Sequence, residues 1–317
     1  MPPVDLASDN ERPALSDMRI VDFPRPQKGS NSQHRLVTLL GEFWADTDAW
    51  LPSHIVQELA GGIGMSRSAT ATAMSRLASR GLLEQSTAGR RSFYRFTTEA
   101  HLGLRSGFQR FASFSSAHDE WDGYWTVIAF TVPETDRPAR EGFKARLKWH
   151  GFAPLYGALW ASPRANIAEL ERICKSYGID DYMVFSAEEA TRAGTNPVQA
   201  WSLDAPRKRY EDFIDKYSPD LTAARKGSLE PAKAFAKRIE LVDTWRTFPW
   251  EDPDLPLVLL PPYWPLPAAR KVFVELYTRY GIGTEKHLRT VLAAHDTELA
   301  GHIALRQMPD AETYVSM

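Results

Sequence analysis

The stretch from Met65 to Thr98 constrains the fold of this chain more than any other part of its sequence. It opens with a helix-forming run of small polar residues and arginine, breaks at Gly81, and continues as two short strand-forming runs joined by a tight turn. A helix followed at once by a β-hairpin is the order of a recognition helix and its wing. The sequence therefore predicts the second half of a winged helix-turn-helix.

The helix of this stretch has two different faces. Ser66 is a good N-cap residue, because its side-chain oxygen can accept a hydrogen bond from a backbone N–H of the first turn. One face has the helical spacing of a stripe that packs on a core, with Thr70, Ala73, Met74 and Leu77. Small residues on the opposite face let a helix enter a major groove about 12 Å wide. They are Ser68, Ala71, Thr72, Ser75 and Ser79.

The same stretch concentrates positive charge. Between Gly61 and Thr97 there are six arginines and one acid, Glu84, although the whole chain has a net charge of −2. A local basic patch is the electrostatic signature of a nucleic-acid-binding surface. The alternative is an ordinary solvated helix whose serines and threonines serve only solubility. We expect double-stranded operator DNA as the partner, with contacts from Ser66, Arg67, Ser68, Thr72, Ser75, Arg76, Arg90, Arg91 and Arg95.

Two further helices are predicted before this stretch. The first, from Ser32, has apolar residues at helical spacing, and the second begins at Pro52–Ser53. The glycines at 61, 62 and 64 are predicted to form the next turn, since glycine readily adopts positive φ. Residues 1–30 contain five prolines and few bulky apolar side chains, so we expect a disordered tail there.

Length and composition set further limits. With 317 residues, of which 43% are hydrophobic, the chain can fill about two or three domain cores. Its single cysteine, Cys174, excludes an intramolecular disulfide and a cysteine-based zinc cluster. No apolar run approaches the ~20 residues of a membrane span, and the N-terminus lacks a signal-peptide core. We expect a cytoplasmic protein with no membrane partner.

A second unit with the element order βαββαβ is predicted from Trp121 onward. Its elements are a strand at Trp125–Val132, a helix at Arg137–His150, a hairpin at Gly151–Pro163 turning at Gly157, a helix at Ile167–Tyr177 and a strand at Asp181–Ser186. This order is the ferredoxin-like arrangement. Its antiparallel sheet has an edge suited to pairing between subunits.

The chain after Pro206 is predicted to be helical. Two final helices are expected at about residues 268–281 and 285–305, after proline-rich breaks. The predicted fold class is therefore α+β. It comprises the tail, a winged helix-turn-helix at residues 31–100, a connector helix at 101–120, a ferredoxin-like middle domain at 121–205 and a helical C-terminal domain at 206–317.

Five segments resemble the PaaX family of bacterial repressors, over about residues 32–300. They are SQHRLVTLLGEF at 32–43, AMSRLASRGLLE at 73–84 running to GRRSFYRFT at 89–97, WDGYWTVIAFTVPE at 121–134, LKWHGFAPLYGALWASPR at 147–164 and DPDLPLVLLPPYWPLPAARKVF at 252–273. The last three are specific, because a generic winged helix has none of them. The resemblance implies a homodimeric repressor of an aromatic-acid catabolic operon, with a middle domain like the CRISPR spacer-acquisition nuclease. It also implies release from DNA by an aryl-CoA thioester such as phenylacetyl-CoA.

Two departures from the family pattern leave the regulon open. Position 71, outward on the predicted recognition helix, is alanine where a basic residue is expected in many relatives, and the N-terminal tail is longer than usual. The alternative is a regulator of this family with another regulon and a non-CoA aromatic effector.

A metal-dependent nuclease is the alternative from a different functional class. Nucleases similar to the middle domain hold a divalent metal with an acidic residue near the end of the first strand. Here that position reads Thr131-Val132-Pro133, and Glu134 follows the proline. The eight histidines, His118 and His150 among them, form no HExxH motif, and there is no glycine-rich phosphate loop. We expect no catalytic residue, no metal and no cofactor; a ligand-free architectural DNA-binding protein is a third hypothesis.

An aryl-CoA effector needs an apolar slot for its ring and basic groups for its phosphates. The effector-binding candidates are Trp149, Trp160, Arg164 and Trp264, with Trp201 and the basic runs at 207–209, 225–226 and 237–238 as further possibilities. Core packing is the competing interpretation for the tryptophans, and a solvated helix face for the basic runs.

Overall fold

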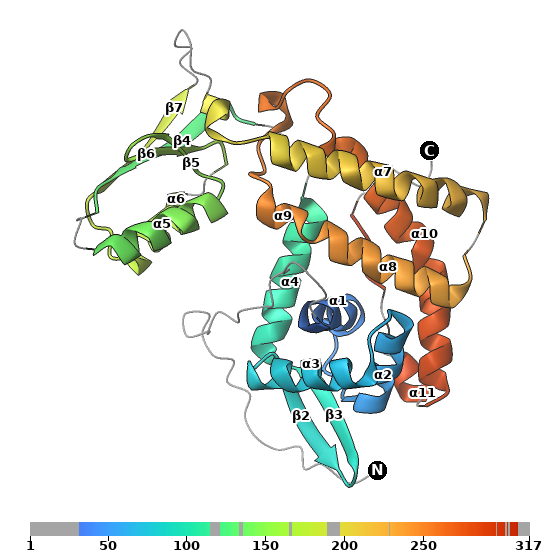
Figure 1. Ribbon diagram of the computed structural model, residues 1–317. Helices are drawn as coiled ribbons and strands as arrows, with labels where there is room; N and C mark the ends of the chain where they lie inside the picture. Colours follow the sequence, from blue (N-terminus) through green and yellow to red (C-terminus); the bar gives the residue numbers. More distant parts are fainter. Residues whose placement is uncertain are drawn as a thin grey trace. The chain divides into compact units, whose positions relative to one another are not determined.

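The computed structural model describes residues 32–114, 121–132, 136–164, 167–188, 197–227, 229–295, 297–301, 303 and 305–309. The predicted tail, His118 and Glu134 lie outside these residues. The described chain is a mixed α+β fold with a helical C-terminal region, as predicted (Figure 1). It divides into two compact units, from residues 1–108 with 288–305 and from 109–287 with 306–317. No described helix is both long and apolar enough to cross a membrane.

The first unit contains short helices and a small sheet (Figure 1). The helices are α1 (Ser32–Trp44), α2 (Ser53–Gly62) and α3 (Arg67–Ser79), and their core-facing side chains include Leu36, Leu39, Ile55, Leu59 and Leu77. The antiparallel sheet has the order β1-β3-β2, with β1 at Leu51–Pro52, β2 at Leu83–Ala88 and β3 at Arg91–Phe96. The start of α4 (Thr98–Ser113) belongs to the same unit.

Two features of this unit differ from the sequence-based prediction. The predicted turn is partly wrong, because Gly61 and Gly62 lie in the last turn of α2 and Gly64 alone of the three has a positive φ, 79°. Strand β1 was not predicted, because two residues carry no alternation pattern. It forms because Leu51 and Pro52 lie opposite Tyr94 and Phe93 of β3.

The second unit begins with a four-stranded antiparallel sheet in the order β5-β6-β4-β7. Its strands and helices follow the predicted order βαββαβ: β4 (Tyr124–Phe130), α5 (Arg137–Trp149), β5 (Ala153–Tyr156), β6 (Leu159–Ser162), α6 (Ile167–Ser176) and β7 (Tyr182–Glu188). Helices α5 and α6 cover one face of the sheet (Figure 1), where Ile128, Phe143 and Trp160 are buried together. On the other face Trp125 packs with Trp201 and Leu255.

Helices make up the remainder of the second unit. They are α7 (Asp204–Lys226), α8 (Pro231–Trp245), the short α9 (Phe248–Glu251) and most of α10 (Leu266–Ala293). Short 3₁₀ turns lie at Pro197–Ala200 and Leu257–Leu259. Trp245 of α8 stacks on Phe273 of α10, with ring centroids 4.5 Å apart.

The two helices predicted at the C-terminus are wrong. A single helix, α10, runs through the expected break, and α11 (Thr297–Gly301) is a separate short helix. Gly283 is a packing position in α10, because a Cβ built there would lie 2.7 Å from the Cβ of Ala234 on α8. This glycine, which lies in the expected break, therefore allows two helices to approach closely. Residues 288–305, expected in the C-terminal domain, belong to the first unit.

Candidate nucleic-acid interface

Helix α3 has the predicted N-cap and the predicted faces. The backbone N–H of Ala69 donates a hydrogen bond to Ser66 Oγ over 3.2 Å, which satisfies one of the free donors of the first turn. Thr70, Ala73, Met74 and Leu77 are buried. The opposite face is exposed along its whole length, at Arg67, Ser68, Ala71, Thr72, Ser75, Arg76 and Ser79.

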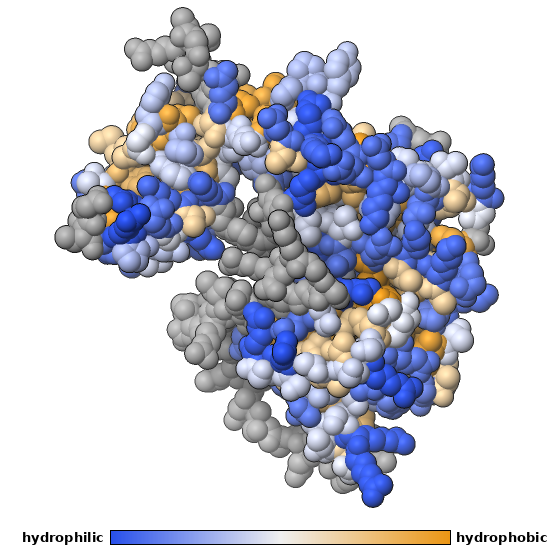
Figure 2. Space-filling view, in the orientation of Figure 1, coloured by the Kyte–Doolittle hydropathy of each residue, from blue (hydrophilic) through white to orange (hydrophobic). Residues whose placement is uncertain are grey.

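The β2–β3 hairpin turns at Gly89 and Arg90, since Ala88 lies opposite Arg91 in the ladder. Gly89 has φ 61°, a conformation that glycine adopts without the steric cost of a side chain. Both Arg90 and Arg91 are exposed, and Figure 2 shows hydrophilic surface at the end of this hairpin. Tyr94 and Phe96 are buried on one side of β3, as the alternation of side chains along a strand requires.

Arg95 has a different environment from the two arginines at the tip. Its guanidinium forms an ion pair with Glu84 at 2.7 Å and lies over the ring of Trp50, 4.6 Å from the centroid. The structure therefore does not place Arg95 with the exposed arginines. Its contacts instead tie β3 to β2 and to the residue before β1. The role of Trp50 had no signal in the sequence, because the contact depends on the pairing of β1 with β3.

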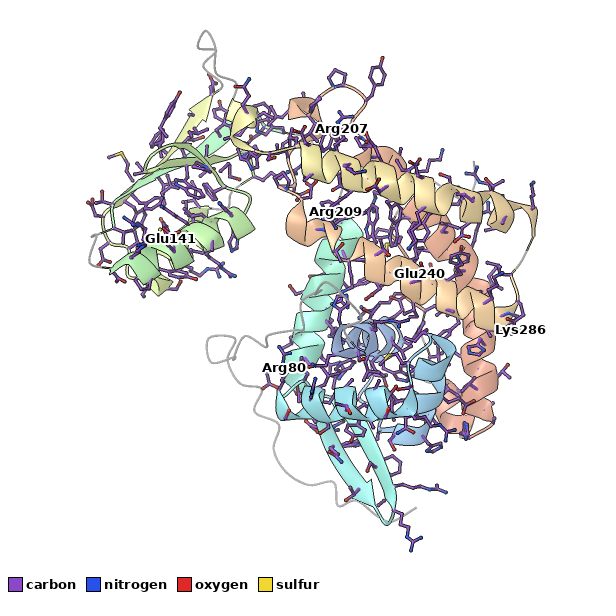
Figure 3. All side chains as sticks on the ribbon, viewed as in Figure 1. Arg80, Glu141, Arg207, Arg209, Glu240 and Lys286 are labelled. Atoms are coloured by element: carbon purple, nitrogen blue, oxygen red, sulfur yellow. The ribbon has the colours of Figure 1, made fainter. Side chains whose placement is uncertain are left out.

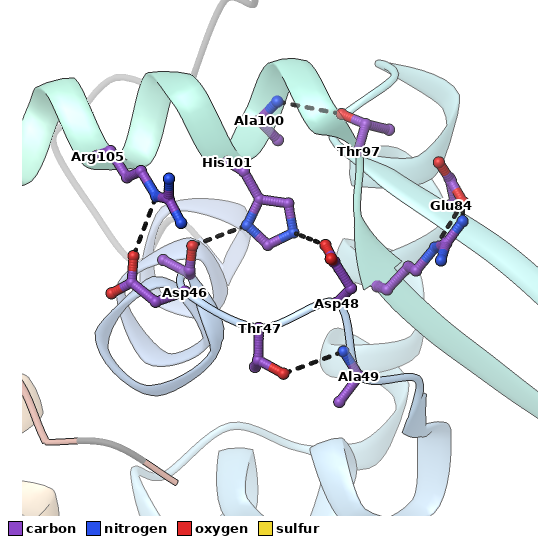
Figure 4. A network of polar contacts seen from close by, with 11 residues as sticks. Asp46, Thr47, Asp48, Ala49, Glu84, Thr97, Ala100, His101 and Arg105 are labelled. Atoms are coloured by element: carbon purple, nitrogen blue, oxygen red, sulfur yellow. Dashed lines mark hydrogen bonds and ion pairs between the residues drawn. The ribbon is translucent and has the colours of Figure 1, made fainter. Parts of the chain in front are cut away.

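Polar contacts fix the start of α4 to the loop after α1 (Figure 4). The Nδ1 of His101 lies 2.8 Å from the carbonyl oxygen of Ala45, and its Nε2 lies 3.4 Å from Asp48 Oδ1. Arg105 Nε donates to Asp46 Oδ1 at 3.2 Å. These contacts orient α4 immediately after the hairpin.

Some exposed polar residues beside this surface were not predicted from the sequence. Arg80 lies at the end of α3 (Figure 3), and its Nη1 is 3.4 Å from Gln33 Oε1. Gln85, Ser86 and Thr87 of β2 are also exposed. The sequence signal for them is a run of small or polar residues, Gln85–Ala88, without alternating apolar side chains. Such a run is typical of a strand that projects beyond its core, because both of its faces are then exposed.

The effector-binding candidates lie in different surroundings. Trp160 is 3% exposed on the sheet face covered by α5 and α6. Trp264 is buried against Tyr210 of α7, with Arg207 over its ring at 4.9 Å. Arg164 donates from Nε to the carbonyl oxygen of Asp254, and the side chain of Trp149 lies outside the described residues. The described contacts do not bring these side chains into one site.

The nuclease hypothesis requires an acidic metal ligand near the end of β4. The residues there are Thr131 and Val132, and the backbone N–H of Thr131 donates a hydrogen bond to the carbonyl oxygen of Asp181 at 2.9 Å. In the part of the chain that the structure describes, no group of three or more His, Cys, Asp or Glu side chains is arranged to hold a metal ion.

Comparison with known proteins covers nearly all of the described chain. Residues 32–100 match the family model of PaaX-like proteins, residues 118–200 the PaaX central Cas2-like domain, and residues 201–290 the PaaX-like C-terminal domain. The chain is 29% identical to the transcriptional repressor PaaX of Escherichia coli (strain K12) over 240 residues, which are 73% of this chain and 74% of that protein.

A solved structure shares the fold. The uncharacterized protein Rv0674 from Mycobacterium tuberculosis matches 78% of this chain and 94% of its own, with a TM-score of 0.52 and 19% identity. Three successive family models thus account for the small sheet and its helices, the four-stranded sheet and the C-terminal helices. The chain belongs to the PaaX family.

Proposed function

We propose that this protein is a DNA-binding transcriptional repressor whose first unit is a winged helix-turn-helix. The observation that carries the proposal is the pairing of α3, with its exposed face of small polar residues and arginine, with a hairpin that presents Arg90 and Arg91 at its tip. Helix α3 enters the major groove and reads base edges through Ser68, Thr72 and Ser75. The hairpin is the wing, and its arginines contact phosphates or the minor groove. The repressor activity of the Escherichia coli relative supports this function.

The proposal includes a domain organisation. The sheet order β5-β6-β4-β7 with two helices on one face supports a ferredoxin-like middle domain at about residues 121–205. The limits of the three family models support boundaries near residues 100, 120 and 205. Residues 101–120 connect the first two domains, and a helical domain begins near residue 206.

The functional form that we propose is a homodimer on an inverted repeat. One winged helix reads only a few base pairs, so useful specificity requires two half-sites separated by about one or more helical turns. The relevant measurement is light scattering at micromolar concentration, without and with operator DNA. A monomer in both conditions contradicts this form.

The proposed effector is an aryl-CoA thioester such as phenylacetyl-CoA, and the proposed target is an aromatic-acid catabolic operon. The family resemblance supports both. A regulator of another regulon with a non-CoA aromatic effector is the alternative, to which Ala71 on the exposed face of α3 points.

Gel-shift experiments on DNA upstream of this gene and of the genes beside it test the proposal. We expect a specific complex that unlabelled operator competes away, and release of the DNA by phenylacetyl-CoA but not by phenylacetate. If no DNA fragment is bound above the non-specific level, the repressor function is wrong. A parallel incubation with Mg²⁺ tests the nuclease alternative, for which cleavage of the DNA would be the positive result.

A further inference from the structure

A hollow of about 380 Å³ lies between α5 and the β5–β6 hairpin. Helix α5 lines it with Glu141, Lys144, Ala145 and Lys148, whose spacing of three, four and seven residues places them on one face of the helix. The neighbouring face of the helix packs into the core through Phe143 and Leu147. Figure 3 labels Glu141 on this helix. The hollow is large enough for a small organic molecule.

The hairpin supplies an apolar wall. Pro154 lies opposite Trp160 in the ladder of β5 and β6, and both line the hollow. Gly157 lies at the turn of the hairpin, where an added Cβ would meet no atom within 4 Å. Trp160 is 97% buried by area, with 3% exposed, and its Nε1–H has no acceptor among the described residues. The indole nitrogen itself is buried, as in several other tryptophans of the chain, so the ring contributes apolar surface to the hollow.

The charges around the hollow favour an anion. Glu141 already has two cationic neighbours, since its Oε1 lies 3.5 Å from Lys144 Nζ and 3.8 Å from Arg140 Nε. Lys148 is exposed, and no carboxylate among the described residues forms an ion pair with it. The two ammonium groups are hydrogen-bond donors, which match the acceptor oxygens of a carboxylate or phosphate.

We infer that this hollow binds the acidic group of a small organic ligand, a carboxylate or a phosphate, between Lys144 and Lys148. The apolar part of the ligand lies against Pro154 and Trp160. The role of the bound ligand as the effector rests on the proposed function, whereas its binding in the hollow does not. Binding is therefore tested without DNA, so that the anion site and the proposed function can fail separately.

Calorimetric titration of the full-length protein gives the test. The probes are phenylacetate, coenzyme A, phenylacetyl-CoA and inorganic phosphate, with neutral phenylacetamide as the uncharged counterpart of phenylacetate. We expect at least one acidic probe to bind. Tighter binding of phenylacetate than of phenylacetamide identifies a carboxylate site, whereas binding of coenzyme A or phosphate identifies a phosphate site.

Variants then locate the bound probe. Replacing both lysines (Lys144→Gln with Lys148→Gln) is expected to weaken binding about tenfold or more, equivalent to about 1.4 kcal/mol per factor of ten. The matched control is Lys175→Gln on α6, an exposed lysine of the same sheet unit, and its affinity is expected to be unchanged. Ala145→Leu fills the hollow from an exposed helix position without altering any charge, and it is expected to abolish binding.

Two results overturn the inference: no acidic probe binds the wild-type protein, or the lysine variant and Ala145→Leu both bind as tightly as wild type. DNA affinity without ligand is expected to be the same in all variants. A wild-type protein that binds a probe but no DNA refutes the proposed function and leaves the anion site intact.

Discussion

Individual arginines on the hairpin have different roles because their neighbours differ. Arg90 and Arg91 are exposed at the tip, whereas Arg95 is held by Glu84 and Trp50. We expect the double variant Arg90→Ala with Arg91→Ala to weaken binding to all DNA sequences. The slope of log affinity against log salt should flatten by up to about two phosphate contacts.

Filter-binding or anisotropy titrations at several salt concentrations measure this effect. The exposed Arg137→Ala on α5 is the matched control, since it removes one arginine from a different unit. Arg95→Ala should instead lower the free energy of unfolding, because it breaks contacts inside the protein. Equal salt slopes for wild type and the tip variant would falsify the assignment of the tip to DNA.

Two serines of α3 provide a second contrast at the scale of single residues. Ser66→Ala removes the acceptor of the Ala69 N–H bond and is expected to cost about 1 kcal/mol of folding free energy in urea unfolding. Ser75→Ala, on the exposed face, should leave stability nearly unchanged and alter which operator is preferred. If the two variants are equally stable, the N-cap contributes nothing.

At the scale of elements, the packing around a helical glycine determines whether replacing it by alanine destabilises or stabilises the protein. Gly283 of α10 faces Ala234 of α8, and an added Cβ would lie 2.7 Å from the Cβ of that alanine. Gly107 of α4 has nothing within 4 Å of such a Cβ. We expect Gly283→Ala to destabilise the protein by about 1–3 kcal/mol through overpacking. Gly107→Ala should stabilise it by about 0.5–1 kcal/mol, since alanine favours a helix. Thermal unfolding of the two variants checks both signs, and a stabilising Gly283→Ala would contradict the close approach.

At the scale of the whole molecule, one carboxyl group links stability to pH. Burial raises the pKa of Asp252 to about 6, although Tyr210 Oη and the Asp254 N–H donate hydrogen bonds to the carboxylate. The segment Asp252–Asp254 contacts both parts of the second unit. Tyr210 of α7 donates to Asp252, and Arg164, which follows β6, donates to the Asp254 carbonyl oxygen. Between about pH 4 and pH 6 the folded protein retains a proton that the unfolded chain has released. This group therefore favours folding less as pH rises through that window.

We expect Asp252→Asn to remove this contribution. Chemical denaturation from pH 4 to pH 7 should show that the difference in unfolding free energy between wild type and variant changes mainly below pH 6 and is constant above it. Glu275 provides the comparison, because its ion pairs with Arg225 and Arg279 lower its pKa. Its stabilising contribution is instead lost as pH falls. A constant difference across the whole range would exclude a raised pKa for Asp252.

Most of the local structure followed from the sequence. The faces of α3, the Ser66 cap and the order βαββαβ depend on residues within about four positions of one another, where side-chain periodicity acts. Arg90 and Arg91 were identified in the same way, since a turn between two strands exposes its own side chains.

Features that depend on long-range packing did not follow from the sequence. Strand β1 exists because Leu51 lies opposite Tyr94, and the guanidinium of Arg95 packs on Trp50, 45 positions earlier. The continuity of α10 through Gly283 was not predicted, because the sequence does not show that this glycine packs against Ala234 of α8. Trp160 was a ligand-binding candidate from the sequence, but its place beside Lys144 and Lys148 depends on the packing of α5 on the hairpin. Local periodicity fixes which face of an element is apolar, but the partner of that face is chosen by the packing of the whole chain.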